Sequence, residues 1–315
     1  MNPFTARASE SVSALGELRL IESIRRWLGD ASPASPFGIG DDCAVIPPTR
    51  YHQLVTTDPV IHGQHFDDAV RPRDVGAKLL KRNLSDIAAM GGRPAVAVIS
   101  LALAPGTKLE WLRHFYLGLA ATARRFDVKI VGGDITQGPA NFLGAFLTLH
   151  GESTGRLITR SGARHGDTLF VTGRLGGSLA GHHYRFTPRL IEGQWLAKQQ
   201  DVAAMMDVSD GIAKDVRSLT PAGLVASIAP QRIPASRAAV AAAKKTGRAA
   251  WEHALIDGED YELLFVVRRQ TDPGKFLQRW ARRFRLPLHH LGSFARKVAP
   301  GDVNWTSLHG YEHLR

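Results

Sequence analysis

Acidic residues recur in short stretches rich in glycine, serine and threonine. The first is Gly38-Ile39-Gly40-Asp41-Asp42-Cys43, in which two glycines let the backbone bend tightly beside two adjacent carboxylates. Four more stretches place an acid at the edge of an apolar segment: Thr56-Thr57-Asp58, Asn83-Leu84-Ser85-Asp86, Gly132-Gly133-Asp134 and Asp207-Val208-Ser209-Asp210-Gly211. Singly, each acid is explained as a turn residue, a helical ion-pair partner or a helix cap. Together they favour a shared site.

Converging carboxylates repel one another, so they either take raised pKa values or hold a cation between them. Their oxygens, with nearby hydroxyls, are ligands suited to Mg²⁺. Zinc is disfavoured because the chain has a single cysteine and no cluster of cysteines and histidines; His62 and His65 are more simply loop residues. We expect Cys43 to be a small buried residue leading into a strand, and Asp41 to face solvent or lie behind the ligands.

No standard phosphate-binding motif is present. The chain lacks a Walker-type G-x-x-x-x-G-K-[ST] sequence, a dinucleotide fingerprint and the H-R-D and D-F-G signatures of protein kinases. A nucleotide would therefore be held by metal ions, by amides of glycine turns and by basic side chains. The candidates are Gly132-Gly133, Gly173 to Gly177, Arg160 and Lys78. For Arg160 a structural role is equally consistent with the sequence.

Length and composition indicate an ordinary globular protein of about two domains. Of the 315 residues, 44% are hydrophobic and 22% charged, and the lone cysteine rules out an intrachain disulfide. No apolar leader is visible in residues 1–10, and the longest apolar run, 95–104, is shorter than the roughly 20 residues that span a bilayer. We expect a cytoplasmic protein that does not contact a membrane.

The formal net charge of +11 suggests an anionic partner without identifying it. The densest basic run, 279–285, fits an amphipathic helix with Phe276, Trp280 and Phe284 inward and the arginines outward. We therefore expect a solvated helix there and no nucleic-acid partner.

The acids must be positioned by strands and helices of two mixed α/β domains, residues 15–150 and 151–315, after a disordered or frayed segment 1–14. In the first domain, periodicity predicts helices near 15–28, 72–90 and 109–126 and strands near 44–46, 53–57, 95–103, 128–131 and 142–150. In the second, it predicts helices at 194–206, after 211, at 235–245 and around 280, and strands at 168–171, 224–228, 261–267, 288–294 and 303–305.

Seven motifs in order resemble those of the thiamine-monophosphate kinases, a family of the aminoimidazole-ribonucleotide synthetase superfamily. They are the five acidic stretches, with Gly63-x-His65-Phe66 and Ala88-Ala89-Met90-Gly91 following two of them, and then Thr159-Arg160-Ser161-Gly162 and Gly258-Glu259-Asp260-Tyr261-Glu262. The resemblance runs from about residue 15 to the C-terminus. It implies the two-domain fold of that superfamily and a homodimer that pairs through the N-terminal sheet.

The resemblance also implies an activity, ATP-dependent phosphorylation of thiamine monophosphate to thiamine diphosphate, and assigns residues to it. Mg²⁺ would be bound by Asp42, Thr56, Thr57, Asp58, Asp86, Asp134, Asp207 and Asp210. ATP would be contacted by Gly133, Asp134, Arg160 and Ser209, and thiamine monophosphate by His65, Glu259 and Tyr311. An ionised phosphate acceptor needs no general base, so catalysis would rest on metal ions, positioning and charge stabilisation, with no acid–base side chain.

Two alternatives predict different features. Among other enzymes of the superfamily, selenophosphate synthetase would carry a reactive N-terminal Cys or selenocysteine, and the hydrogenase-maturation protein a cysteine near the C-terminus. An aminoimidazole-ribonucleotide synthetase would lack the motif at 258–262. A basic nucleic-acid-binding protein would bind with a steep salt dependence, and it leaves the acidic stretches unexplained.

Overall fold

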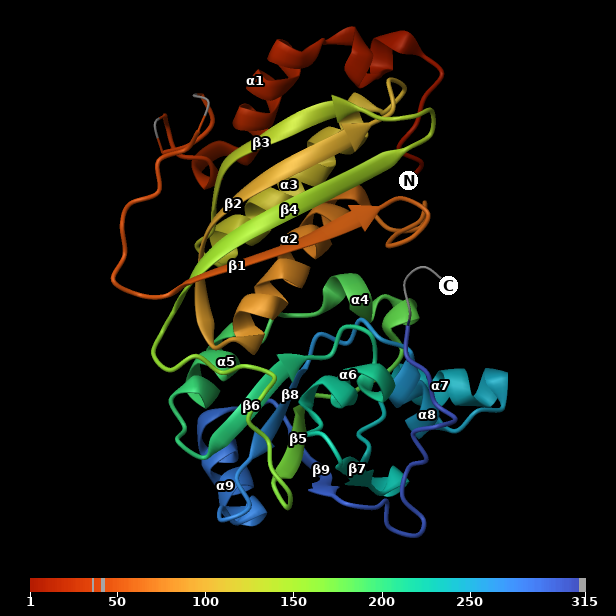
Figure 1. Ribbon diagram of the computed structural model, residues 1–315. Coiled ribbons are helices and arrows are strands. Elements are labelled where there is room, and N and C mark those ends of the chain that lie inside the picture. The colour runs from red at the N-terminus through yellow and green to blue at the C-terminus, as the bar shows by residue number, and fades with distance from the viewer. Residues whose placement is uncertain (36, 41–42, 312–315) are drawn as a thin grey trace. The chain divides into compact units, whose positions relative to one another are not determined.

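The computed structural model describes residues 1–35, 37–40 and 43–311 (Figure 1). The contacts within it divide the chain into two compact units, Met1–Ile87 with Arg93–Ser153, and Ala88–Gly92 with Thr154–Arg315. Each unit has its own β-sheet and its own helices. The prediction of a mixed α/β protein built from two sheets is confirmed.

The sheet of the first unit has the strand order β1-β4-β2-β3. Its strands are β1 (Gln53–Ile61), β2 (Gly92–Leu103), β3 (Lys129–Gln137) and β4 (Leu143–Ser153). β1 and β4 are antiparallel, whereas β2 and β3 are parallel. A parallel pair requires a crossover connection, and here it is α3 (Leu109–Arg125), which lies with α2 (Pro72–Ala89) against one face of the sheet (Figure 1).

Alternation along the strands separates a buried face from an exposed one. In β4, Leu147 and Leu149 are buried on the helix side, while Phe146, directly before Leu147, points the other way and is 38% exposed. Val55 of β1 and Val98 of β2 are 61% and 36% exposed on that outer face. The first unit therefore presents an apolar sheet face that its own helices leave uncovered.

The expectation of a frayed N-terminus is wrong. Residues 1–14 form 3₁₀ turns at Ala8–Glu10 and Val12–Ala14, and Ser11 and Val12 are buried. β-Bridges join Phe4 to Thr107 and Ser11 to Lys108, so the segment is held beside the start of α3. Its polar residues make local hydrogen bonds that composition alone does not reveal. The helix expected from residue 15 is α1 (Glu17–Leu28).

The strand expected at 44–46 is absent, since these residues have irregular structure ahead of Pro47 and Pro48. Val45 and Ile46 are exposed, and so is the thiol-bearing Cys43, which we expected to be buried. The expectation failed for Cys43 because no strand follows it to carry it into the core.

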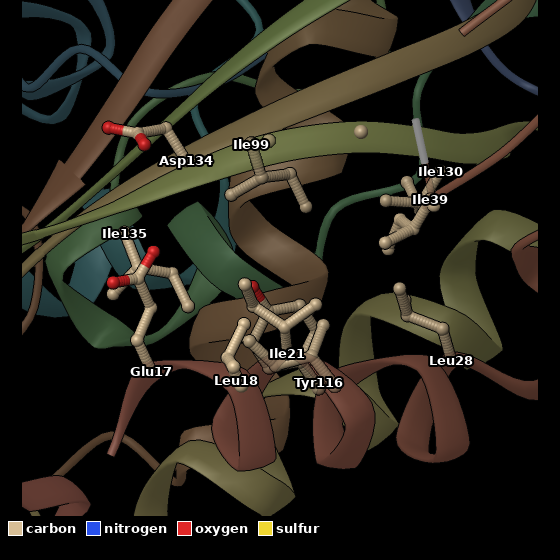
Figure 2. A pocket seen from close by; sticks show the side chains of 14 residues that line it. Glu17, Leu18, Ile21, Leu28, Ile39, Ile99, Tyr116, Ile130, Asp134 and Ile135 are labelled. Carbon is tan, nitrogen blue, oxygen red and sulfur yellow. The ribbon is translucent and has the colours of Figure 1, made fainter. Parts of the chain in front are cut away.

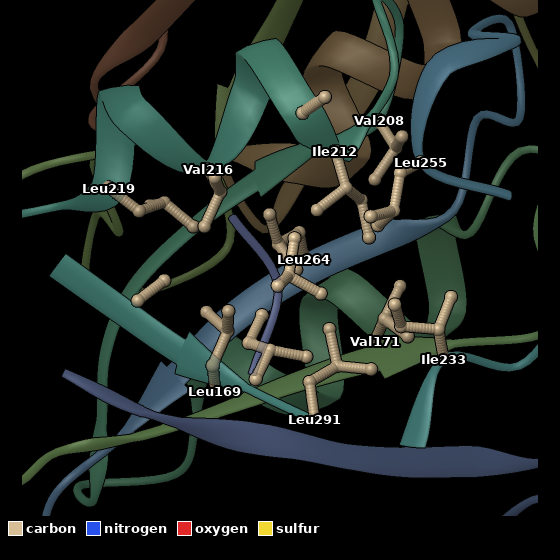
Figure 3. Packing of buried hydrophobic residues seen from close by; sticks show 14 of the residues in the cluster. Leu169, Val171, Val208, Ile212, Val216, Leu219, Ile233, Leu255, Leu264 and Leu291 are labelled. Atoms are coloured by element: carbon tan, nitrogen blue, oxygen red, sulfur yellow. The ribbon is translucent and has the colours of Figure 1, made fainter. Parts of the chain in front are cut away.

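The second unit contains a sheet of order β6-β8-β5-β9-β7 in which the paired strands are antiparallel. The strands are β5 (Thr168–Thr172), β6 (Val202–Asp207), β7 (Val225–Ile228), β8 (Leu263–Val267) and β9 (Leu288–Ala295). The helices are α4 (His182–Arg185), α5 (Leu190–Ala197), α6 (Ile212–Leu219), α7 (Arg237–Thr246), α8 (Ala250–Ile256) and α9 (Pro273–Arg283). Apolar side chains of α6, β5, β8 and β9 interdigitate in its core (Figure 3).

Two predictions for this unit are wrong. The helix expected at 194–206 ends at Ala197, and 202–207 is strand β6, whose residues are all buried. A short run that is apolar on every side has no period that separates a strand from a buried helix. The expected last strand at 303–305 is irregular, although Val303 N donates to Ile228 O at 2.9 Å.

The basic helix is confirmed as amphipathic: in α9, Phe276 and Trp280 are fully buried while Arg282 and Arg283 are exposed. Across the described part of the chain, no helix combines the length and the hydropathy needed to cross a bilayer. The cytoplasmic location stays a prediction.

Candidate functional site

Thr56 and Asp58 point from β1 towards α2. Thr56 Oγ1 donates to Asp86 Oδ2 at 2.5 Å, and Arg82 donates to Asp58 Oδ1 at 3.0 Å. Both carboxylates are thus held by polar partners where β1 meets α2. Thr57 lies on the opposite face, where its hydroxyl donates to Leu147 O at 3.0 Å. Neighbouring residues of a strand face opposite sides, so the Thr57 hydroxyl and the Asp58 carboxylate cannot ligate the same ion.

Asp134 lies on the other edge of this sheet. β1 and β3 are the two edge strands, with β4 and β2 between them. Adjacent strands are roughly 4.8 Å apart, so Asp134 is on the order of 14 Å from Asp58. A single copy of the first unit therefore does not gather all its predicted acids, contrary to our expectation of one cluster.

Gly133 and Asp134 line a cavity of about 610 Å³ (Figure 2). The acids Asp134 and Glu17 lie at one end of it and Leu28 at the other (Figure 2). Its aliphatic lining residues are Leu18, Ile21, Ile24, Leu28, Ile39, Ile99, Ile130 and Ile135. At Gly133 a Cβ atom would come within 2.1 Å of Ile99 O, so only glycine fits beside the cavity.

The sequence predicted a helix near residues 15–28 but not its contribution to this cavity. The available signal was the apolar side chains at helical spacing, of which Leu18, Ile21, Ile24 and Leu28 line the cavity. Of these side chains, Leu18 is 78% exposed, whereas Ile24 and Leu28 are buried.

His65 is placed by contacts within its own loop and by Lys78. Ile61 N donates to His65 Nδ1 at 3.2 Å, which leaves Nε2 to carry the proton of the neutral ring. Lys78 is fully buried, and its ammonium donates to His65 O at 2.8 Å. Lys78 therefore supports the loop that carries His65, and its proposed role as a phosphate ligand is not supported.

In the second unit, three segments far apart in sequence are joined by main-chain hydrogen bonds. Glu259 N donates to Ser209 O at 2.7 Å, and Tyr311 N donates to Asp210 O at 2.9 Å. Asp207 ends β6 directly before this turn, opposite Leu263 of β8. The structure therefore brings together the predicted residues Asp207, Ser209, Asp210, Glu259 and Tyr311.

Two basic residues lie in this region. Lys214 Nζ donates to Asp210 Oδ2 at 2.6 Å and to Tyr311 O at 3.0 Å, a role the sequence analysis did not anticipate. Arg160 follows Thr159, whose carbonyl accepts from Met205 N of β6 at 3.0 Å. Arg160 is exposed, and no hydrogen bond joins it to another described residue. An exposed guanidinium of this kind favours the ligand-binding interpretation over the structural one.

The Glu259 carboxylate is held on both oxygens. Tyr261 Oη donates to Oε1 at 3.1 Å, and His183 Nδ1 lies 3.5 Å from Oε2. Glu259 and Tyr261 have left-handed backbone angles, with φ of 50° and 52°. Such angles are costly for residues other than glycine and concentrate at functional sites. Phe186 supports the arrangement by stacking on Tyr261, with ring centroids 4.0 Å apart.

The glycine-rich turn at 173–177 is not a phosphate cradle. Gly176 N donates to Asp260 Oδ1 at 2.7 Å, and Gly177 N donates to Asp257 Oδ2 at 2.9 Å. These amides are already bound to carboxylates, so they are not available to a phosphate. Of the two glycine turns suggested by the sequence, Gly132-Gly133 at the cavity remains.

Known proteins resemble this chain in sequence and in structure. The family described as AIR synthase related protein, N-terminal domain, matches residues 40–152. The thiamine-monophosphate kinase of Rhodopirellula baltica is 39% identical over 247 residues, covering 75% of this chain and 77% of its own. The chain belongs to the thiamine-monophosphate kinase family. This confirms the family and the fold that the motifs predict.

Solved structures of thiamine-monophosphate kinases agree with this placement. The enzyme of Stenotrophomonas maltophilia has a TM-score of 0.73 and 32% identity, covering 90% of this chain and 95% of its own. The structure of AaThiL complexed with AMPPCP and TMP has a TM-score of 0.72 and 29% identity, covering 99% of this chain and all of that one.

The predicted metal ligands of this family member are carboxylate and hydroxyl oxygens, the donor set that Mg²⁺ prefers. Burial, followed by the charges of Asp207 and Asp210, raises the pKa of Asp215 to about 7. A cation would relieve this repulsion, so the residues fit Mg²⁺. Within the described residues, however, no three acidic, histidine or cysteine side chains are grouped closely enough to hold an ion. Asp41 and Asp42 lie outside the described residues.

The buried carboxyl group of Asp260 makes the stability of the folded chain depend on pH. Its side chain is 1% exposed, and Oδ2 has no hydrogen-bond partner among the described residues. Burial is the main cause that raises its pKa well above the ordinary value. The charges of Glu262 and Asp257 add to this, and the Gly176 amide opposes it.

We expect Asp260→Asn to stabilise the protein, and more so as pH rises from 5 to 8. The unfolded Asp ionises near pH 4, whereas the folded one keeps its proton to a higher pH. Wild-type stability therefore falls across that window, and Asn, which has no proton to lose, avoids the fall while still accepting from Gly176 N. A gain of about 1 kcal/mol at pH 8 would raise Tm by roughly 2–4 °C in thermal scans. A gain that shrinks with pH would contradict the expectation.

Proposed function

We propose that this protein transfers the terminal phosphoryl group of ATP to thiamine monophosphate, yielding thiamine diphosphate and ADP. The observation that carries the proposal is the convergence in the second unit of the segments at 207–211, 258–262 and 310–311. Each contributes residues that the family resemblance assigns to metal, ATP or thiamine monophosphate. The AaThiL structure with AMPPCP, an ATP analogue, and TMP supports both substrates.

The residues proposed to contact ATP are Gly133 and Asp134 in the first unit, and Arg160 and Ser209 in the second. In the first, the cavity beside Gly133 and Asp134 has a volume and an apolar wall suited to a nucleoside. In the second, the exposed Arg160 suits a phosphate, because its guanidinium donates in a planar fork. Ser209 supplies a hydroxyl next to Asp210. These groups orient the triphosphate for in-line transfer.

Thiamine monophosphate is bound by His65, Glu259 and Tyr311. Its thiazolium ring is a cation, and both a carboxylate and an aromatic face attract cations. Glu259 provides the carboxylate, fixed by Tyr261 and His183, and the exposed ring of Tyr311 provides the aromatic face. The acceptor oxygen belongs to an already ionised phosphate, so none of these residues has to remove a proton.

Mg²⁺ is the proposed cofactor. The side chains proposed as ligands are those of Asp42, Thr56, Asp58, Asp86, Asp134, Asp207 and Asp210. If the Thr57 hydroxyl is also a ligand, it binds a different ion from the one that Asp58 binds. When bound, Mg²⁺ neutralises the phosphate charges that otherwise keep donor and acceptor apart.

A direct assay tests the proposal. The purified chain is incubated with ATP, Mg²⁺ and thiamine monophosphate, and thiamine diphosphate and ADP are quantified by chromatography. Parallel reactions contain free thiamine as acceptor or excess EDTA. We expect product only with the monophosphate and only with free Mg²⁺. Phosphorylation of thiamine, but not of its monophosphate, would overturn the assignment.

We also propose that the protein is a homodimer that pairs through the outer face of the first unit's sheet. Val55, Val98 and Phe146 expose apolar surface there, and a second copy would bury it. Pairing would also allow β3 of one protomer to approach β1 of its partner. This would bring Asp134 closer to the site around Asp58 than one copy allows.

Phe146→Lys is expected to shift the protein from dimer to monomer, because a charged side chain cannot be buried unpaired at the centre of this face. Light scattering coupled to size-exclusion chromatography measures the mass. Ile191→Lys is the control, since Ile191 is 63% exposed but lies on α5 of the second unit. The proposed interface is wrong if both variants remain dimeric, or if both become monomeric.

A further inference from the structure

Asp215 belongs to none of the sequence motifs, yet it contacts one of them directly. It lies in the first turn of α6 and is 4% exposed. Its Oδ2 accepts from Ser209 N at 3.0 Å and from Asp210 N at 3.1 Å. The N-cap residue of α6 is Gly211, which has no side chain that could cap the helix. The amides of the Ser209–Asp210 turn are thus held by a carboxylate from inside the helix.

The carbonyls of the same turn hold the other parts of the site. Ser209 O accepts from Glu259 N at 2.7 Å, and Asp210 O accepts from Tyr311 N at 2.9 Å. The turn is therefore fixed on its amide side by Asp215, and on its carbonyl side it fixes Glu259 and Tyr311. A shift of the turn would move the Ser209 and Asp210 side chains and both attached residues together.

We propose that Asp215 is a positioning residue for phosphoryl transfer, acting by holding the Ser209–Asp210 turn through these two hydrogen bonds. The inference rests on the proposed function. Asp215 acts from behind the turn, through the residues that bind substrate. One buried oxygen that accepts from two successive amides defines the orientation of the turn. Small displacements at a reacting centre lower rates by about a hundredfold.

Two variants separate the hydrogen bonds from the charge. Asp215→Asn keeps an oxygen that can accept from both amides, and Asp215→Ala removes it. Asp167→Ala is the matched control, because Asp167 is 2% exposed and accepts from Arg164 N at 2.9 Å and Arg269 N at 3.0 Å. Asp167 directly precedes β5 at its Val267-paired end, whereas the site adjoins the Leu263 end of β8.

The first readout is hydrogen exchange of the Ser209 and Asp210 amides in the chain without substrates. We expect slow exchange in the wild type and exchange at least about tenfold faster in Asp215→Ala, since these amides lose their buried hydrogen-bond acceptor. Unprotected amides in the wild type would overturn the proposal, even if Asp215→Ala failed to fold. This readout is independent of catalysis, so it decides the role of Asp215 in the turn even if the wild type proves inactive as a kinase.

The second readout is steady-state kinetics with ATP and thiamine monophosphate. We expect kcat/KM to fall about a hundredfold in Asp215→Ala and to return to within about tenfold of wild type in Asp215→Asn. Asp167→Ala should lose thermal stability but keep kcat and both KM values within twofold. An active wild type overturns the proposal if folded Asp215→Ala matches it within twofold, or if Asp215→Asn is as impaired as Asp215→Ala.

Discussion

Asp58→Asn should lower kcat for thiamine monophosphate phosphorylation by roughly a hundredfold or more, the loss seen when one preorganised charge-stabilising group is removed. Asp58 Oδ1 accepts from Arg82 at 3.0 Å, and Arg82 also donates to Pro59 O at 2.7 Å. Arg82 can therefore retain the local backbone after the substitution. The expected defect is loss of the carboxylate charge proposed to bind Mg²⁺, with the fold preserved.

A Mg²⁺ titration separates metal binding from other causes. If Asp58 is a ligand, Asp58→Asn should need a higher Mg²⁺ concentration for half-maximal rate, in addition to its lower maximum. Asp127→Asn is the control: Asp127 is an exposed acid of the same unit with φ of 53°, a conformation that Asn also tolerates. Turnover by Asp58→Asn within about twofold of wild type would rule out the proposed ligand role.

In the second unit, the proposed site residues could be recognised from the sequence, but the contacts that hold them could not. Asp207, Ser209 and Glu259 were recognisable because acids, hydroxyls and glycines were concentrated there. Their partners, Asp215, Lys214 and His183, carry no such signal, since they are ordinary helix residues by pattern. Which amide or carboxylate they reach depends on how α4 and α6 pack, and periodicity does not encode that.

The order of the strands in the first unit's sheet could not be predicted from the sequence either. Alternation along β1 and β3 predicts which side chains share a face, but it does not predict which strands are neighbours. The order β1-β4-β2-β3 places Asp58 and Asp134 on opposite edges. The expectation that both acids lie in one cluster assumed that motifs from the same domain must meet. In this sheet, such a meeting would need a second copy of the chain.

The sequence also suggested glycine turns as phosphate ligands, and the structure separates the two suggestions. A Cβ at Gly133 would collide with the backbone of β2, beside an open cavity. At Gly173, a Cβ would come within 2.0 Å of the Glu262 carboxylate, so that glycine is required by a buried acid. Glycine marks close approach in both cases, but the sequence does not say whether the neighbour is a backbone atom, as at Gly133, or a side chain, as at Gly173.

The buried acid Glu262 forms an ion pair with Arg189 in the second unit. Glu262 is 2% exposed and accepts from Arg189 Nε at 2.8 Å, from Arg189 Nη2 at 2.5 Å and from Thr172 Oγ1 at 2.6 Å. Thr172 Oγ1 in turn accepts from Leu263 N at 2.9 Å. The pair thus lies at the end of β5 and β8 that carries the 258–262 segment.

Arg189→Met should therefore destabilise the protein by about 3–5 kcal/mol, because it leaves the Glu262 carboxylate buried without its counter-charge. At roughly 2–4 °C per kcal/mol for a unit of this size, Tm should fall by about 6–20 °C. Arg93→Met is the control: Arg93 is 65% exposed in its pair with Glu152, and such surface pairs contribute about 1 kcal/mol or less. Equal losses in the two variants would contradict the argument.

The double variant Arg189→Met/Glu262→Met distinguishes the cost of an unpaired charge from the loss of packing. A buried pair gains Coulomb energy but loses the hydration of both ions, so replacing both partners with apolar side chains removes the penalty along with the attraction. We expect the double variant to recover most of the Tm lost in Arg189→Met. If it were as unstable as the single variant, the contribution of Arg189 would come from its stem packing and from the Thr172 network rather than from its charge.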